Sequence, residues 1–119
     1  MNERLHPFRM LTCFNLSPTA TIEQFAHALD VFTAQMKRKK LILNCEPLGQ
    51  RQRHPVMDTD GERNHEYFFI MTFKNRDQCD DAVRYMMSRP VNRDEYHASL
   101  LRYVVDPVFI CWEDLNPAS

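Results

Sequence analysis

One stretch, residues 65–73 with the sequence HEYFFIMTF, constrains most strongly what this chain can fold into. It is rich in aromatic residues, lacks glycine and proline, and is too short for a buried helix, so we predict a β-strand. Successive side chains of a strand point to opposite faces of the sheet. Both faces are apolar here, with Tyr67, Phe69, Met71 and Phe73 on one and Phe68, Ile70 and Thr72 on the other. The strand therefore belongs in the middle of a sheet that is covered on both sides.

The composition is that of one small globular domain. The chain has 119 residues, of which 44% are hydrophobic, and we expect a single domain over 1–119 with its core at about 8–115. A formal net charge of −1 gives no strong field toward nucleic acid or an anionic membrane. The chain shows no secretory signal and no stretch near the ~18 apolar residues of a membrane span, so we expect a cytoplasmic protein.

Cysteine and histidine spacing gives no metal site. The four cysteines, at 13, 45, 79 and 111, include no close pair, whereas a zinc site or a disulfide framework would need tighter spacing. We therefore expect reduced thiols and predict neither a metal nor a cofactor. A metal gathered at the polar loop 54–64 is the less favoured alternative to a solvated turn; its ligands would be His54, Asp58, Asp60 and His65.

The first half of the chain predicts a strand, a helix and a second strand. Residues 8–16 alternate as a strand does, and Thr21 with Gln24 forms a capping box that opens a helix. An apolar stripe follows at helical spacing, formed by Ile22, Phe25, Leu29, Phe32 and Met36. Residues 41–53 predict a second, edge strand, bent at Pro47 or Gly49.

The second half predicts two helices and a closing strand. Asn75 and Gln78 cap a helix carrying Cys79, Val83 and Met86, and Pro90 ends it. A second, short helix follows from a cap at 92–95, and the last strand, 104–115, is broken at 106–107.

This order of elements predicts an α+β fold. A helix that joins strands one and two needs a right-handed crossover, and the hairpin of strands two and three lets strand three fill the gap between them. The result is a ferredoxin-like split βαβ, with a four-stranded antiparallel sheet of order 4-1-3-2 and helices on one face. We expect the helices to cover Leu11, Cys13, Phe69, Met71 and Phe73. The opposite face would then expose a contiguous apolar patch of Met10, Phe14, Phe68 and Ile70, which a second copy, a ligand or RNA bases must cover.

RNA is the first occupant to consider, because RNA-recognition motifs share this topology and stack bases on the open face. Residues 11–16 resemble their first signature, including the final Asn-Leu pair. However, Thr12 stands where that signature has an aromatic residue, and Glu66 stands where the second has Lys or Arg. RNA binding is therefore the third choice among the functions considered.

A second resemblance covers roughly residues 8–115. The aromatic strand ends at Phe73 before a polar helix start at 74–77, a short helix carries His97, and a closing strand follows the acidic-Pro pair 106–107. In this pattern the chain resembles the dimeric α/β-barrel superfamily, in particular its stress-responsive (Dabb-type) branch. The resemblance implies a homodimer whose two sheets pack face to face, which would cover Met10, Phe14, Phe68 and Ile70.

The resemblance also implies a chemistry. Enzymes of the superfamily hold an apolar substrate between sheet and helices, several without a metal or organic cofactor, and a helix histidine acts as the base in the cyclase-like members. The matching residue is His97, and an imidazole titrating near ~6.5 suits proton abstraction. Candidate pocket residues are Tyr67, Tyr96, Tyr103 and Trp112.

The function expected from the sequence has two forms. One is a small-molecule-binding, cofactor-free enzyme of the cyclase, isomerase or monooxygenase type, acting on a small apolar or aromatic ligand. The other is a non-enzymatic structural homodimer, in which His97 is only a solvated or hydrogen-bonded side chain at the edge of an apolar stripe.

Overall fold

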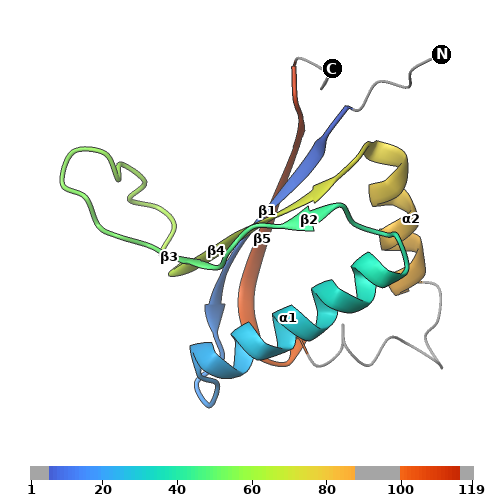
Figure 1. Cartoon of the computed structure of the whole chain (residues 1–119). Helices are drawn as coiled ribbons and strands as arrows, with labels where there is room; N and C mark the ends of the chain where they lie inside the picture. Colours follow the sequence, from blue (N-terminus) through green and yellow to red (C-terminus); the bar gives the residue numbers. More distant parts are fainter. Residues whose placement is uncertain (1–5, 88–99, 116–119) are drawn as a thin grey trace.

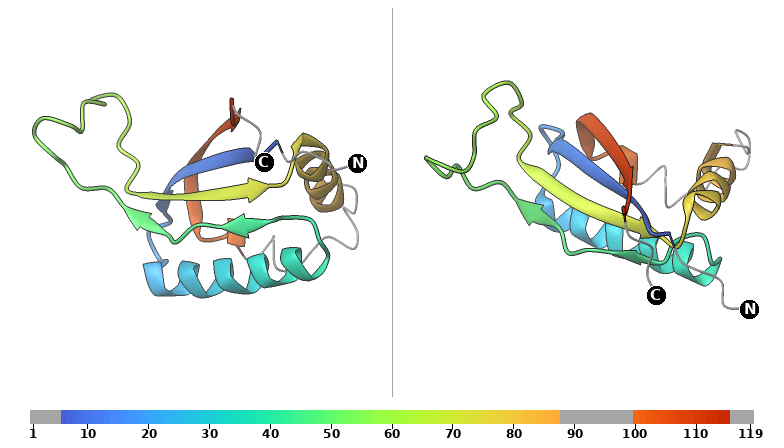
Figure 2. Two further views of the ribbon diagram at one scale, coloured as in Figure 1. Left: turned by 45° about the horizontal axis from the view of Figure 1, so that its top comes forward. Right: turned by 90° about the horizontal axis from the view of Figure 1, so that it is seen from above.

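The computed structural model describes residues 6–87 and 100–115. The elements follow the chain as β1 (Phe8–Leu16), α1 (Ile22–Arg38), β2 (Asn44–Cys45), β3 (Gly49–Gln50), β4 (Tyr67–Phe73), α2 (Arg76–Met87) and β5 (Val104–Glu113). The antiparallel sheet has the order β2-β4-β1-β5, and β3 pairs with the other end of β4. Both helices lie on one face of it (Figures 1 and 2). With β2 and β3 counted as one strand, this is the predicted 4-1-3-2 order, and the ferredoxin-like α+β fold is confirmed.

Helix α1 begins and packs as its sequence predicts. The Thr21 hydroxyl accepts the backbone N–H of Gln24 at 3.2 Å, and the Gln24 side-chain oxygen accepts the backbone N–H of Thr21 at 2.9 Å. This reciprocal pair satisfies two amides that the first turn leaves free. The apolar stripe of the helix is buried at Phe25, Leu29, Phe32 and Met36.

Helix α2 begins at the predicted cap and turns Cys79 and Met86 toward the core, as predicted. The Asn75 side chain accepts the Gln78 backbone N–H at 2.9 Å. Its buried residues are Gln78, Cys79 and Ala82, whereas Val83 is 43% exposed. The end of this helix at Pro90 and the short helix predicted after Asn92 lie outside the described residues. Within the described residues, neither helix has the length and hydropathy needed to cross a membrane.

Two strand predictions need correction. Residues 41–53 are interrupted at 46–48, as predicted for Pro47, which has no N–H to donate to a ladder, but they form two short strands, β2 and β3, where one was expected. The closing strand is not broken at 106–107: β5 is continuous, and its register with β1 shifts between Cys13 and Asn15. Asp106 takes up the extra residue as a bulge, with φ of 53°, and His65 Nε2 donates to its carbonyl oxygen at 2.7 Å.

The two faces of β1 are the reverse of the prediction. Met10, Thr12 and Phe14 pair in register with Met71, Phe69 and Tyr67, and antiparallel partners share a face. The Phe14 ring is fully buried, 4.5 Å from the ring of Phe25 on α1. Met10 and Phe14 therefore face the helices and do not belong to the open face, where Leu11 and Cys13 lie beside the correctly placed Phe68 and Ile70.

A long arm, residues 51–66, connects β3 to β4 and projects away from the sheet (Figure 1). Its base is organised around Arg51, whose side chain is only 9% exposed. The guanidinium donates to both carboxylate oxygens of Asp58, at 2.7 and 2.6 Å, and to the backbone carbonyls of Asp60 and Arg63 at 2.8 and 2.6 Å. These four hydrogen bonds hold the two sides of the arm together.

Candidate functional site

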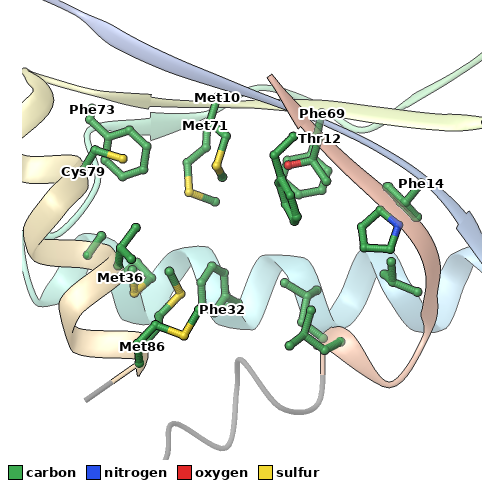
Figure 3. Close-up of a pocket in the computed structure, with 18 of the residues that line it drawn as sticks. Met10, Thr12, Phe14, Phe32, Met36, Phe69, Met71, Phe73, Cys79 and Met86 are labelled. Carbon is green, nitrogen blue, oxygen red and sulfur yellow. The ribbon is translucent and has the colours of Figure 1, made fainter. Parts of the chain in front are cut away.

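An apolar cavity of about 270 Å³ lies between the sheet and the two helices (Figure 3). A cavity of ~150 Å³ lined by apolar side chains accommodates benzene, and drug-sized ligands occupy pockets from ~300 Å³ upward. The size therefore suits a compact molecule of one or two rings. The lining residues are Met10, Thr12, Phe14, Phe25, Phe32, Met36, Phe69, Met71, Phe73, Cys79, Ala82, Val83, Met86, Met87, Leu100, Leu101, Val104, Pro107 and Phe109.

Methionine and phenylalanine supply most of this lining. Figure 3 shows Met10 and Met71 projecting from the sheet toward Met36 and Met86 of the helices. Methionine is unbranched and adapts its shape to a neighbouring surface. The cavity is therefore suited to an apolar guest whose outline differs from that of the empty space.

The lining carries very little polarity. Among the described lining residues none is an acid, a histidine or an amine, and Thr12 supplies the one hydroxyl. Burial raises the pKa of the Cys79 thiol to about 11, and the neighbouring Cys111 adds to the increase. The thiol is thus protonated at neutral pH and is not an activated nucleophile.

The structure places the predicted site residues in different regions. His97 and Tyr96 lie outside the described residues. Tyr67 and Tyr103 are half-buried against the core but do not line the cavity. Trp112 pairs in register with Arg9, so it lies on the open face of the sheet, where it is 38% exposed. The roles proposed for these residues stay predictions.

Sequence reasoning missed the residues that do form the lining. Met10 and Phe14 were predicted to share one face of their strand, and that grouping is right. That face was assigned to the side of the sheet away from the helices, so neither residue, nor Thr12 between them, was predicted to line a pocket. The methionines of α2 and Phe109 of β5 are hydrophobic, and nothing else in the sequence indicates that they line a cavity.

The open face of the sheet carries a second apolar surface. Arg9 lies at its edge, donating to both carboxylate oxygens of Asp114 at 2.9 Å and to the hydroxyl of Thr72 at 3.2 Å. The hydrogen bond from Arg9 holds the pKa of the Asp114 carboxyl below its usual value. We call the apolar residues of this surface the open-face patch: Leu11, Phe68, Ile70, Val108, Ile110 and Trp112.

The polar arm does not assemble a metal site. Within residues 6–87 and 100–115, no group of three or more His, Cys, Asp or Glu side chains is placed to hold a metal ion. Asp58 is engaged by Arg51, and Asp60 pairs with Arg63.

No family model and no curated protein matches this sequence. Solved structures match its fold. The Arabidopsis thaliana protein At3g17210 aligns with a TM-score of 0.69 at 8% sequence identity, over 92% of this chain and 96% of that one. A dimeric ferredoxin-like protein of unknown function from Thermobifida fusca aligns with a TM-score of 0.56 at 17% identity, over 90% of each chain.

A third structure of this fold is that of an enzyme. SnoaB, a cofactor-independent oxygenase from Streptomyces nogalater, aligns with a TM-score of 0.56 at 9% identity, over 90% of this chain and 91% of that one. At such identities the likeness concerns the fold alone. The resemblance to dimeric ferredoxin-like proteins is thereby confirmed at the level of the fold, and the stress-responsive branch within it stays a prediction.

Proposed function

We propose that this chain forms a homodimer that binds a small apolar or aromatic molecule between sheet and helices, and transforms it without a cofactor, using His97 as a general base. The observation that carries the proposal is the apolar cavity of about 270 Å³. The cavity is partly open at its rim, where Met87 and Phe109 are 73% and 54% exposed, and a concave apolar pocket of this kind is the usual form of a small-molecule site.

The cavity favours an apolar guest because of what surrounds it. Each Å² of apolar ligand surface removed from water contributes ~25 cal/mol to the binding free energy. The side chains of the described lining offer a ligand few polar contacts in addition. A charged ligand would lose its hydration without gaining a partner among the described lining residues.

His97 is favoured as the base by its position in the sequence. It precedes Leu100 and Leu101, which both line the cavity, by three and four residues. The described lining holds no group that is a base at neutral pH, so proton abstraction from a bound carbon acid needs one from outside it. SnoaB, with the same fold, is a cofactor-independent oxygenase, and this supports the same class of chemistry here.

The homodimer is supported by the open-face patch. Two of its large side chains, Ile110 and Trp112, are 45% and 38% exposed in the isolated chain. A contiguous apolar surface of this kind marks an interface. Dimers are also reported for structural neighbours, including the ferredoxin-like protein from Thermobifida fusca.

The test is a panel of phenolic and polyketide-like compounds, assayed for binding by calorimetry and for turnover by mass spectrometry. We expect His97→Ala to bind ligand within about twofold of wild type and to lose turnover by ~10²–10⁴-fold, the usual contribution of a general base. His27→Ala, which removes an exposed histidine of α1, is the matched control and should change neither quantity.

The outcomes separate the parts of the proposal. Equal turnover by His97→Ala and wild type would remove the role of the base and leave the binding function. Binding without turnover by any variant would favour the non-enzymatic homodimer. A wild-type protein that binds no compound of the panel would contradict the cavity as a ligand site.

A further inference from the structure

Thr12 is a buried hydroxyl in an apolar wall. It lies in the middle of β1, is 5% exposed, and lines the cavity (Figure 3). Its oxygen has no hydrogen-bond partner among the described residues. Its register partners on the two neighbouring strands are Phe69 and Phe109, whose side chains have no polar atom to offer. A buried hydroxyl without a partner destabilises a folded protein, so its presence here needs a reason.

A second buried threonine on the same sheet shows the contrast. Thr72 of β4 is also 5% exposed, but it faces the opposite side, where its hydroxyl accepts from Arg9 at 3.2 Å. The sheet thus gives one of these two threonines a protein partner and leaves the other, which lies on the cavity side, without one among the described residues. A valine at position 12 has the same shape and would fill the wall of the cavity without leaving a buried hydroxyl unpaired.

Resting on the proposed function, we infer that the Thr12 hydroxyl is the polar anchor of the ligand site, and that the ligand is an uncharged, ring-sized apolar molecule with one hydrogen-bonding oxygen, of the phenol or ketone type. A threonine hydroxyl both donates and accepts, so it matches either oxygen. An analogue that lacks the oxygen leaves the hydroxyl unpaired and binds more weakly. The site thereby selects among apolar molecules of equal size.

The experiment is a double-mutant cycle between ligand and protein, with 1-naphthol and naphthalene as the probe pair. Calorimetry measures both affinities for wild type and for Thr12→Val, which replaces the hydroxyl by a methyl group of similar size. We expect the preference for 1-naphthol to be about tenfold greater in wild type than in the variant, as for one buried hydrogen bond. Thr12→Ser should retain the preference, and Thr72→Val, which alters the opposite face, should leave it unchanged.

Thermal unfolding without ligand gives an independent readout. Thr12→Val should raise the midpoint by a few degrees, because it removes an unpaired buried hydroxyl, whereas Thr72→Val should lower it. Thr12→Ala removes the hydroxyl without adding volume, and it replaces Thr12→Val in the cycle if the latter fails to fold.

An equal preference in wild type and Thr12→Val would overturn the inference and leave the cavity as a ligand site. A lower midpoint for Thr12→Val would also overturn it, by showing that the hydroxyl has a partner in the free protein. Failure of wild type to bind either compound would remove the proposed function itself, and the inference with it.

Discussion

Phe14 shows how much one aromatic residue decides in this molecule. Its ring is fully buried and lies within 6.0 Å of the rings of Phe25, Tyr67 and Phe69. Aromatic pairs at such distances contribute beyond the area they bury. Phe14 thus joins β1, β4 and α1 at one point of the core, beside the cavity.

Phe14→Ala should therefore lower the free energy of unfolding by about 3–5 kcal/mol, the usual cost of removing a buried phenylalanine. Phe109→Ala is the matched control, since that side chain is 54% exposed, and it should cost about 1–2 kcal/mol. Urea denaturation measures both. Equal losses would contradict the burial of Phe14 and return it to the open face.

At this scale the sequence predicts groups of residues but not their side of the sheet. Alternation places Met10, Thr12 and Phe14 together with certainty, because the period of a strand is two. Which face the helices cover depends on how β1 aligns with β4, and a shift of one residue exchanges the faces. Both faces of β1 and β4 are apolar, so hydrophobicity does not distinguish the two alignments.

Charged side chains organise the arm of residues 51–66. The hydrogen bonds from Arg51 lower the pKa of Asp58. The side chain of Arg63, followed by the backbone N–H groups of Glu62 and Arg63, lowers the pKa of Asp60 to about 2. Both carboxylates thus stabilise the folded arm in their ionised form.

The sign of the pH dependence follows from these depressed pKa values. The stabilisation is complete above the ordinary carboxyl pKa and is lost as the pH falls from about 4 to about 2, through the folded-state values. Backbone amide NMR signals of the arm should broaden or shift to random-coil positions over this range, while those of β1 and β4 persist. An arm whose signals stay unchanged at about pH 2 would contradict this account.

Asp58→Asn should disorder the arm already at neutral pH, because it removes the charge that Arg51 binds. The NMR signals of the arm should then be broadened or at random-coil positions, as expected for wild type at about pH 2. Asp81→Asn is the control: it breaks an exposed ion pair with Arg84 on α2 and should leave the arm signals as they are.

The elements also show where local signals suffice. The capping box of Thr21 and Gln24 predicted the start of α1, because a cap is made by residues three apart. Arg51 was not predicted as a centre of the arm, since two of its four hydrogen bonds go to backbone carbonyls, which every residue has. No spacing rule encodes such a contact.

At the scale of the whole molecule, the open-face patch predicts the oligomeric state. Wild type should sediment as a dimer at micromolar concentration. Ile110→Asp should weaken the dimer by at least 100-fold, because it buries an unpaired charge in the interface. Leu43→Asp, a change at a residue that is 50% exposed outside this patch, should leave the dimer intact.

A monomeric wild type would contradict the interface and leave the cavity unaffected, because the two lie on opposite faces of the sheet. The order of elements was enough to predict this two-sided architecture, since few topologies satisfy the crossover and hairpin rules together. The cavity was not predictable from the sequence. It exists because side chains from five different elements do not completely fill the space between the sheet and the helices, and the sequence does not show how closely they pack.

The bulge at Asp106 has a consequence for solubility. β5 is an edge strand of ten residues, and a long unpaired edge is a template for amyloid-like growth. The strand is continuous, but the left-handed backbone of Asp106 makes a bulge near its start, and Pro107 has no N–H to offer to an added strand. An apolar open face can therefore coexist with an edge strand that is poorly suited to pairing with further chains.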